Sequence, residues 1–140
     1  MGKRRTEGYM TFGVICLSLL MLALAHSVYG QAYMSLRSVR EEAVYVACTY
    51  GVERGLAVVF ERIDATGRGS GSEIEMTETH RIGLESYRED GLSETKKRIT
   101  CVVFCTDRRN GFTAKKKLTV TVESDASGAY RTNIEALHAV

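Results

Sequence analysis

The sequence predicts an all-β fold, a sandwich of two antiparallel sheets. Three observations carry this prediction. Short segments rich in β-branched and aromatic residues recur along the chain, their apolar residues alternate at a period of two, and glycine, asparagine and aspartate separate them. Beyond the N-terminal region, almost no stretch repeats its apolar residues at helical spacing. The sequence therefore favours strands over helices for the folded part of the chain.

The N-terminus predicts a secretory signal peptide spanning residues 1–30. Residues 3–5 are basic, and residues 12–25 form an apolar run. This order, followed by a site with small residues, is typical of a cleaved signal. Val28 and Gly30 fit the −3 and −1 positions, so the mature chain is expected to begin at Gln31. The predicted protein is secreted and extracellular, with no membrane insertion after cleavage.

Two alternatives for this segment stay open. Cleavage after Ala25 is the second choice of site. The segment is also compatible with an uncleaved signal anchor, because the apolar run extends through Tyr29 to about the lower limit for a membrane-spanning helix. In that case the product is a type II membrane protein. With cleavage, one domain is expected over residues 31–124, and residues 125–140 are expected to be a flexible C-terminal tail.

Two strands are predicted in the first half of the domain. Residues 43–50 place Val46 and Cys48 on one face at a period of two. Residues 56–63 form the next strand and place Phe60 on its inner face. Val46 and Phe60 are therefore predicted core residues.

The clearest element is a hairpin over residues 97–122. In its first strand, residues 99, 101, 103 and 105 share one face, and Val102 and Phe104 lie on the other. Asn110-Gly111 is a strong hairpin signal, because a type I′ turn needs positive φ at both central residues. In the second strand, Leu118 and Val120 alternate with lysine and threonine, so they are predicted to lie in the core.

These segments resemble an immunoglobulin-like domain. In that comparison, residues 43–50, 56–63, 98–105 and 115–123 correspond to the B, C, F and G strands. The resemblance extends over about residues 31–124 and implies a single-domain secreted protein of that superfamily. Two features depart from the family pattern: Phe60 stands where the core tryptophan of strand C is expected, and Ile99 stands where a tyrosine precedes the second cysteine.

Three cysteines remain after signal cleavage, since Cys16 lies in the signal. Cys48 and Cys101 lie on predicted core faces, and in a secreted chain they are expected to form a disulfide. The sandwich implied by the resemblance makes Cys101 the better partner. Cys105 is then a free thiol or forms an intermolecular disulfide that joins a homodimer. A Cys48–Cys105 pairing and a bond to another partner stay open.

The sequence contains no convincing catalytic or metal-binding pattern. After cleavage only His80 and His138 remain as histidines, and neither is part of a recognisable nucleophile–base arrangement. The spacing of Cys101 and Cys105 on one strand does not suit a zinc site. The glycines of residues 67–71 are not followed by the Lys-Ser/Thr of a phosphate loop. We expect no enzymatic activity, no cofactor, no metal and no nucleic-acid partner.

The expected function is protein binding. Arg108, Arg109, Asn110 and Phe112 lie at the hairpin turn, and Phe104 lies on the outward strand face, so these residues are the candidate contacts for a cell-surface or extracellular protein. Such a module fits adhesion, receptor modulation or a role as soluble ligand or decoy. The alternative is a small disulfide-stapled secreted effector or inhibitor that acts through the 107–112 loop.

Overall fold

The computed structural model describes residues 3–71 and 73–140. One helix, α1 (Lys3–Thr66), is followed by five strands. These are β1 (Glu73–Met76), β2 (His80–Gly91), β3 (Lys96–Asp107), β4 (Thr113–Ser124) and β5 (Tyr130–Ala139). The chain divides into two compact units, Met1–Glu41 and Glu42–Val140. We call them the first and the second unit.

The prediction of an all-β two-sheet sandwich is wrong. Residues 43–50 and 56–63, predicted as strands, belong to α1, and the second unit holds a single antiparallel sheet. The same apolar residues fit helical spacing as well as alternation. Cys48, Val52, Leu56, Val59 and Ile63 follow one another at intervals of three or four residues, and all are buried. Tertiary packing of this face outweighs the strand preference of the β-branched residues.

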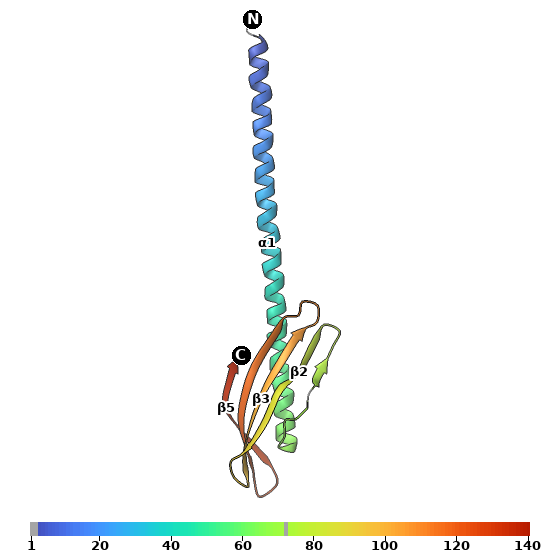
Figure 1. The fold of residues 1–140 in the computed structure, drawn as a ribbon, viewed down its shortest axis with the longest axis vertical. Helices are drawn as coiled ribbons and strands as arrows, with labels where there is room; N and C mark the ends of the chain where they lie inside the picture. The colour runs from blue at the N-terminus through green and yellow to red at the C-terminus, as the bar shows by residue number, and fades with distance from the viewer. Residues whose placement is uncertain (1–2, 72) are drawn as a thin grey trace. The chain divides into compact units, whose positions relative to one another are not determined.

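The five strands form a meander in which each strand pairs with the next along the chain (Figure 1). The predicted hairpin of residues 97–122 is confirmed: β3 and β4 pair from Lys96–Glu123 to Thr106–Thr113. The β2–β3 register slips between Leu84 and Ser86. One sheet face carries the core.

The core lies between that sheet face and the 42–66 part of α1, which runs along the sheet in Figure 1. Leu118 and Val120 are fully buried there, and Phe60 is half-buried. Val46, expected in the core, is instead 56% exposed, because on a helix it lies opposite Cys48 and Val52. The period-two pattern had placed Val46 and Cys48 on the same face.

Two helical glycines permit the close approach of α1 to the sheet. A Cβ at Gly55 would lie 2.8 Å from Ile82 Cγ2 and 2.8 Å from Val103 Cγ1, and a Cβ at Gly51 would lie 2.5 Å from Cys105 Sγ. Glycine in a helix interior costs up to about 1 kcal/mol relative to alanine. Here that cost is offset by contact between the helix backbone and the sheet.

Residues 125–140, predicted as a flexible tail, contribute β5, an edge strand paired with β4 from Ser124–Tyr130 to Lys116–Ala139. Its side chains are mostly exposed. Backbone hydrogen bonds to β4 therefore order this segment where apolar burial is small. At the other end of the chain, α1 runs through Gly30 without a break. Cleavage after Gly30 stays a prediction.

Candidate interaction surfaces

In the first unit, every side chain of residues 8–41 is exposed. Large apolar residues are among them, with Leu17, Leu20 and Leu24 each more than half exposed. Within the described residues, α1 is the one helix long and apolar enough to cross a membrane. A signal sequence near the N-terminus passes the same test.

Beyond the most apolar stretch, the first unit still exposes apolar residues at helical spacing. Val28, Ala32, Leu36 and Val39 follow one another at intervals of four, four and three residues, and Val28, Leu36 and Val39 are 65%, 72% and 61% exposed. We call this row the seam. Away from the seam, Tyr33 and Met34 are exposed as well, and an i,i+4 ion pair joins Arg37 Nε to Glu41 Oε1 at 2.9 Å.

The second unit carries a short apolar row with the same spacing. Ala43, Val46 and Tyr50 are exposed and lie on the helix surface that does not pack on the sheet. Because residues 43–50 were predicted as a strand, this row of exposed apolar residues was not identified from the sequence. The signal was present in the sequence, since the intervals between these residues are three and four.

The predicted binding turn is ordered by its own side chains. Asp107 is buried, and its Oδ1 accepts hydrogen bonds from the backbone N–H groups of Asn110 and Arg109, both at 2.8 Å. These N–H groups, Asn110 first, hold the pKa of Asp107 below its usual value. The Arg108 backbone N–H donates to Thr79 O at 2.8 Å. The turn is thus a rigid loop that leaves Arg108, Arg109 and Asn110 exposed.

Phe112, predicted as a partner contact, is engaged within the chain. Its ring packs edge-on against Tyr45 of α1, with the ring centroids 5.8 Å apart, and it is 37% exposed. Contacts of this kind contribute about 0.5–1.5 kcal/mol beyond the area that they bury. Most of the ring therefore helps to hold the hairpin against the helix.

The outer sheet face is polar and not an apolar patch. Phe104 and Val102 point outward as predicted, but both are half-buried, and the Arg81 guanidinium lies 5.9 Å from the Phe104 ring centroid. Ion pairs cross the same face: Lys115 Nζ lies 2.7 Å from Glu85 Oε1, and Arg98 Nε lies 2.9 Å from Glu135 Oε2. Exposed pairs of this kind add little stability, but they make the face hydrophilic.

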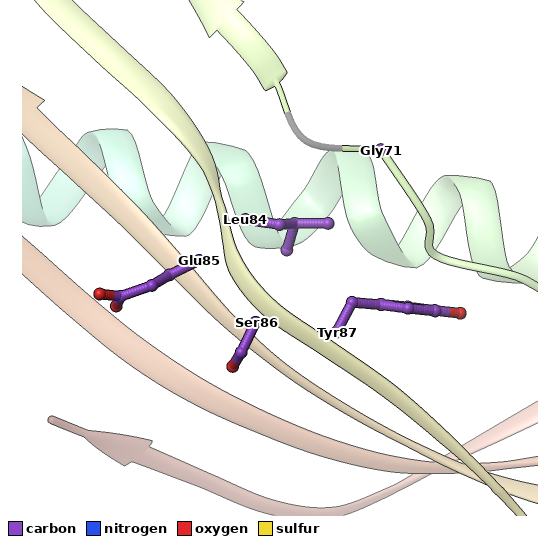
Figure 2. Close-up of a pocket in the computed structure, with 5 residues that line it drawn as sticks. All are labelled: Gly71, Leu84, Glu85, Ser86 and Tyr87. Carbon is purple, nitrogen blue, oxygen red and sulfur yellow. The ribbon is translucent and has the colours of Figure 1, made fainter.

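A hollow of about 230 Å³ lies beside β2 at its register slip, lined by Gly71, Leu84, Glu85, Ser86 and Tyr87. Figure 2 shows Leu84 and Tyr87 extending to one side of the strand and Glu85 and Ser86 to the other. The Tyr87 hydroxyl accepts from the Gly69 N–H at 3.0 Å and donates to Glu89. Burial, followed by the bond to Glu89, raises the pKa of Tyr87 to about 12. This hydroxyl is a structural link and not a proton donor at neutral pH.

All four cysteines, each within the described residues, are free thiols, and Cys48, Cys101 and Cys105 are fully buried. Cys105 packs against α1 at Gly51, three residues after Cys48, and Cys48 and Cys105 each perturb the pKa of the other. Burial raises the pKa of Cys101 to about 11, and burial together with Cys48 raises that of Cys105 to about 12. Neither thiol is a ready nucleophile.

His80 pairs with Asp107 across β2 and β3, two positions along the strands from the Ile82–Cys105 pair. Its Nδ1 is 2.8 Å from Thr79 Oγ1, and its Nε2 is 3.9 Å from Asp107 Oδ2. Since the neighbouring Cys105 holds its proton, the arrangement supplies no thiolate.

Among the described residues, no three His, Cys, Asp or Glu side chains are grouped so as to hold a metal ion. Comparisons of the chain with protein-family models, with curated proteins and with solved structures find no match. Function is therefore argued from the surfaces alone.

Proposed function

We propose that the protein is a non-catalytic membrane-anchored subunit that spans the membrane once and carries the second unit outside, where it assembles with other subunits through its helix. The observation that carries this proposal is the exposure of every described side chain of residues 8–41, apolar ones included. A bilayer covers the first part of this surface, and a partner helix covers the rest.

Residues 9–29 have the properties of a membrane anchor. They contain no Asp, Glu, Lys or Arg, and at 1.5 Å per residue they extend about 30 Å, the thickness of the hydrocarbon core. Tyr9 and Tyr29 stand at the two ends, where aromatic residues favour the interface between lipid and water. Residues 3–5 are basic, and such charge is retained on the cytoplasmic side. This orientation carries the second unit across the membrane.

The seam continues past this anchor into water. Leu36 and Val39 lie well beyond Tyr29, and a row of apolar side chains at helical spacing is costly when it faces solvent. Its spacing suits another helix with a similar row. We identify the partner as a second copy of this chain, because in each copy the seam lies at the same distance along the helix from the anchor.

Cysteine crosslinking in membranes tests the seam. In a Cys16→Ser background, Leu36→Cys is expected to form a covalent dimer rapidly on mild oxidation. The matched control is Arg37→Cys, the next residue, whose side chain is turned about 100° around the helix from Leu36, and it is expected to crosslink slowly. Equal rates for the two variants contradict the proposal.

A second candidate function is the secreted binding module expected from the sequence. The exposed and rigid turn at Arg108, Arg109 and Asn110 favours it, since such a loop suits contact with another protein. Intact mass separates the two functions. A chain that retains residues 9–29 in carbonate-washed membranes supports the anchored subunit, and a chain recovered from the medium with Gln31 at its N-terminus supports the secreted module.

A further inference from the structure

The position of Cys105 is fixed by the helix backbone opposite it. Its Sγ lies 2.5 Å and its Cβ 3.2 Å from where a Cβ at Gly51 would stand. Cys48 lies three residues before Gly51, on the same helix surface. The absence of a side chain at Gly51 therefore brings the Cys105 thiol down to the helix surface that holds Cys48.

The two thiols lie in a closed environment. Cys48 and Cys105 are both fully buried, and Cys48 Sγ donates to Phe112 O at 3.9 Å. Cys101 lies four residues before Cys105 on β3, about 13 Å away along an extended strand. Burial raises its pKa, with no contribution from Cys48.

We propose that Cys48 and Cys105 form an intrachain disulfide that joins α1 to β3 and leaves Cys101 reduced. The oxidant is a small-molecule or protein disulfide, as in an oxidising compartment. One cysteine thiolate attacks this disulfide and expels one thiol, and the second cysteine then displaces the other thiol from the mixed disulfide. The chain loses two electrons and two protons, and the oxidant takes up both to become two thiols.

The bond is expected to form while the chain folds. In the native protein both thiols are buried and protonated, so they react slowly with an external disulfide. Once the bond has formed, the same burial shields it from reductants. Burial also opposes a disulfide between copies through Cys105, because another molecule reaches that sulfur only if the core opens.

In cells, formation of this disulfide depends on the proposed function in one respect: the second unit must lie outside the reducing cytoplasm. The test is therefore made with the purified full-length chain in detergent. The denatured and reduced protein is refolded in a mixture of reduced and oxidised glutathione, alkylated, and mapped by mass spectrometry of its peptides.

The expected product contains one crosslink between the peptides of Cys48 and Cys105, and Cys101 is alkylated only after denaturation. The variant Cys101→Ala is expected to retain the crosslink, and Cys48→Ala is expected to lose it while still folding. A Cys48–Cys101 crosslink overturns the inference, as does the recovery of all three cysteines of the second unit in alkylated form. A crosslink that forms in glutathione but is missing from protein isolated from cells supports the inference and contradicts the proposed orientation.

Discussion

The two parts of α1 have similar residues and opposite surroundings. In residues 8–41 every side chain is exposed, whereas in residues 42–66 one surface is buried, with Cys48, Val59 and Ile63 fully so. The buried surface is covered by β3 and β4 of the same chain. In residues 42–66 the apolar helix surface is thus buried by the rest of the chain. In residues 8–41 the apolar surface can be buried only by lipid or by a partner.

The largest expected difference in stability between the two regions comes from placing one carboxylate in each of them. Val59→Asp puts a carboxylate in the core and is expected to cost several kcal/mol, a large part of the stability of a small domain. Val39→Asp, at a position 61% exposed, is expected to leave the second unit folded. Resistance of residues 42–140 to limited proteolysis measures both. Equal protease sensitivity of the two variants would break the comparison.

A smaller loss of stability is expected when Gly55 of α1 is replaced by alanine. Gly55→Ala forces a Cβ to within 2.8 Å of Ile82 and of Val103, both of which are stiff at χ1. The overpacking is expected to cost about 1–3 kcal/mol, more than the roughly 1 kcal/mol gained in helix propensity. Gly30→Ala is the matched control, since its Cβ would meet nothing within 4 Å. Urea denaturation of the second unit is expected to shift for Gly55→Ala alone.

High pH is expected to distinguish the reduced chain from the oxidised one. The pKa of Cys105 is raised to about 12 and that of Cys101 to about 11, against about 8.5 for an unperturbed thiol. The stability that these protonated thiols supply is present below pH about 8.5 and declines as pH rises toward the raised values. Of the two thiols with these raised pKa values, the oxidised chain retains only Cys101, so its denaturation midpoint is expected to fall less. Parallel curves for the two forms would contradict the pairing.

The smallest expected effect is the loss of stability at low pH caused by protonation of Asp107 in the 107–112 turn. The pKa of Asp107 is lowered by hydrogen bonds from the Asn110 and Arg109 N–H groups, so its contribution is present above pH about 4 and is lost as pH falls further. Asp107→Asn is expected to flatten the loss of stability below that pH. Glu78→Gln, an exposed carboxylate in the nearby β1–β2 turn, is the control and is expected to retain the wild-type slope.

The β3–β4 hairpin was predictable because its signals are local. Asn110-Gly111 marks the turn, and Gly111 has φ of 70°, but the predicted type I′ geometry is wrong, since no described residue other than glycine, Asn110 included, has a positive φ. The alternation of Leu118 and Val120 with polar residues specifies which strand face is inward. Local signals of this kind hold whatever the remainder of the chain does.

The helix over residues 42–66 was not predictable in the same way. Val44, Val46 and Cys48 fit alternation, while Val44, Cys48 and Val52 fit helical spacing, and only the packing against β3 and β4 decides between them. Whether this segment is a strand or a helix also decides which way the candidate site residues point. On a strand, Val46 and Cys48 share a face. On a helix, Cys48 turns to Cys105, and Val46 turns to solvent with Tyr50.

The central claim is that residues 9–29 stay in the mature protein and hold it in the membrane with the second unit outside. Protease treatment of intact cells that express the chain with a tag at each end tests it most directly. If residues 9–29 hold the chain in the membrane, the tag after Val140 is expected to be lost, while the N-terminal tag survives on a short membrane-bound fragment. Survival of both tags on a cell-bound full-length chain, or release into the medium of a chain that begins at Gln31, would contradict the account.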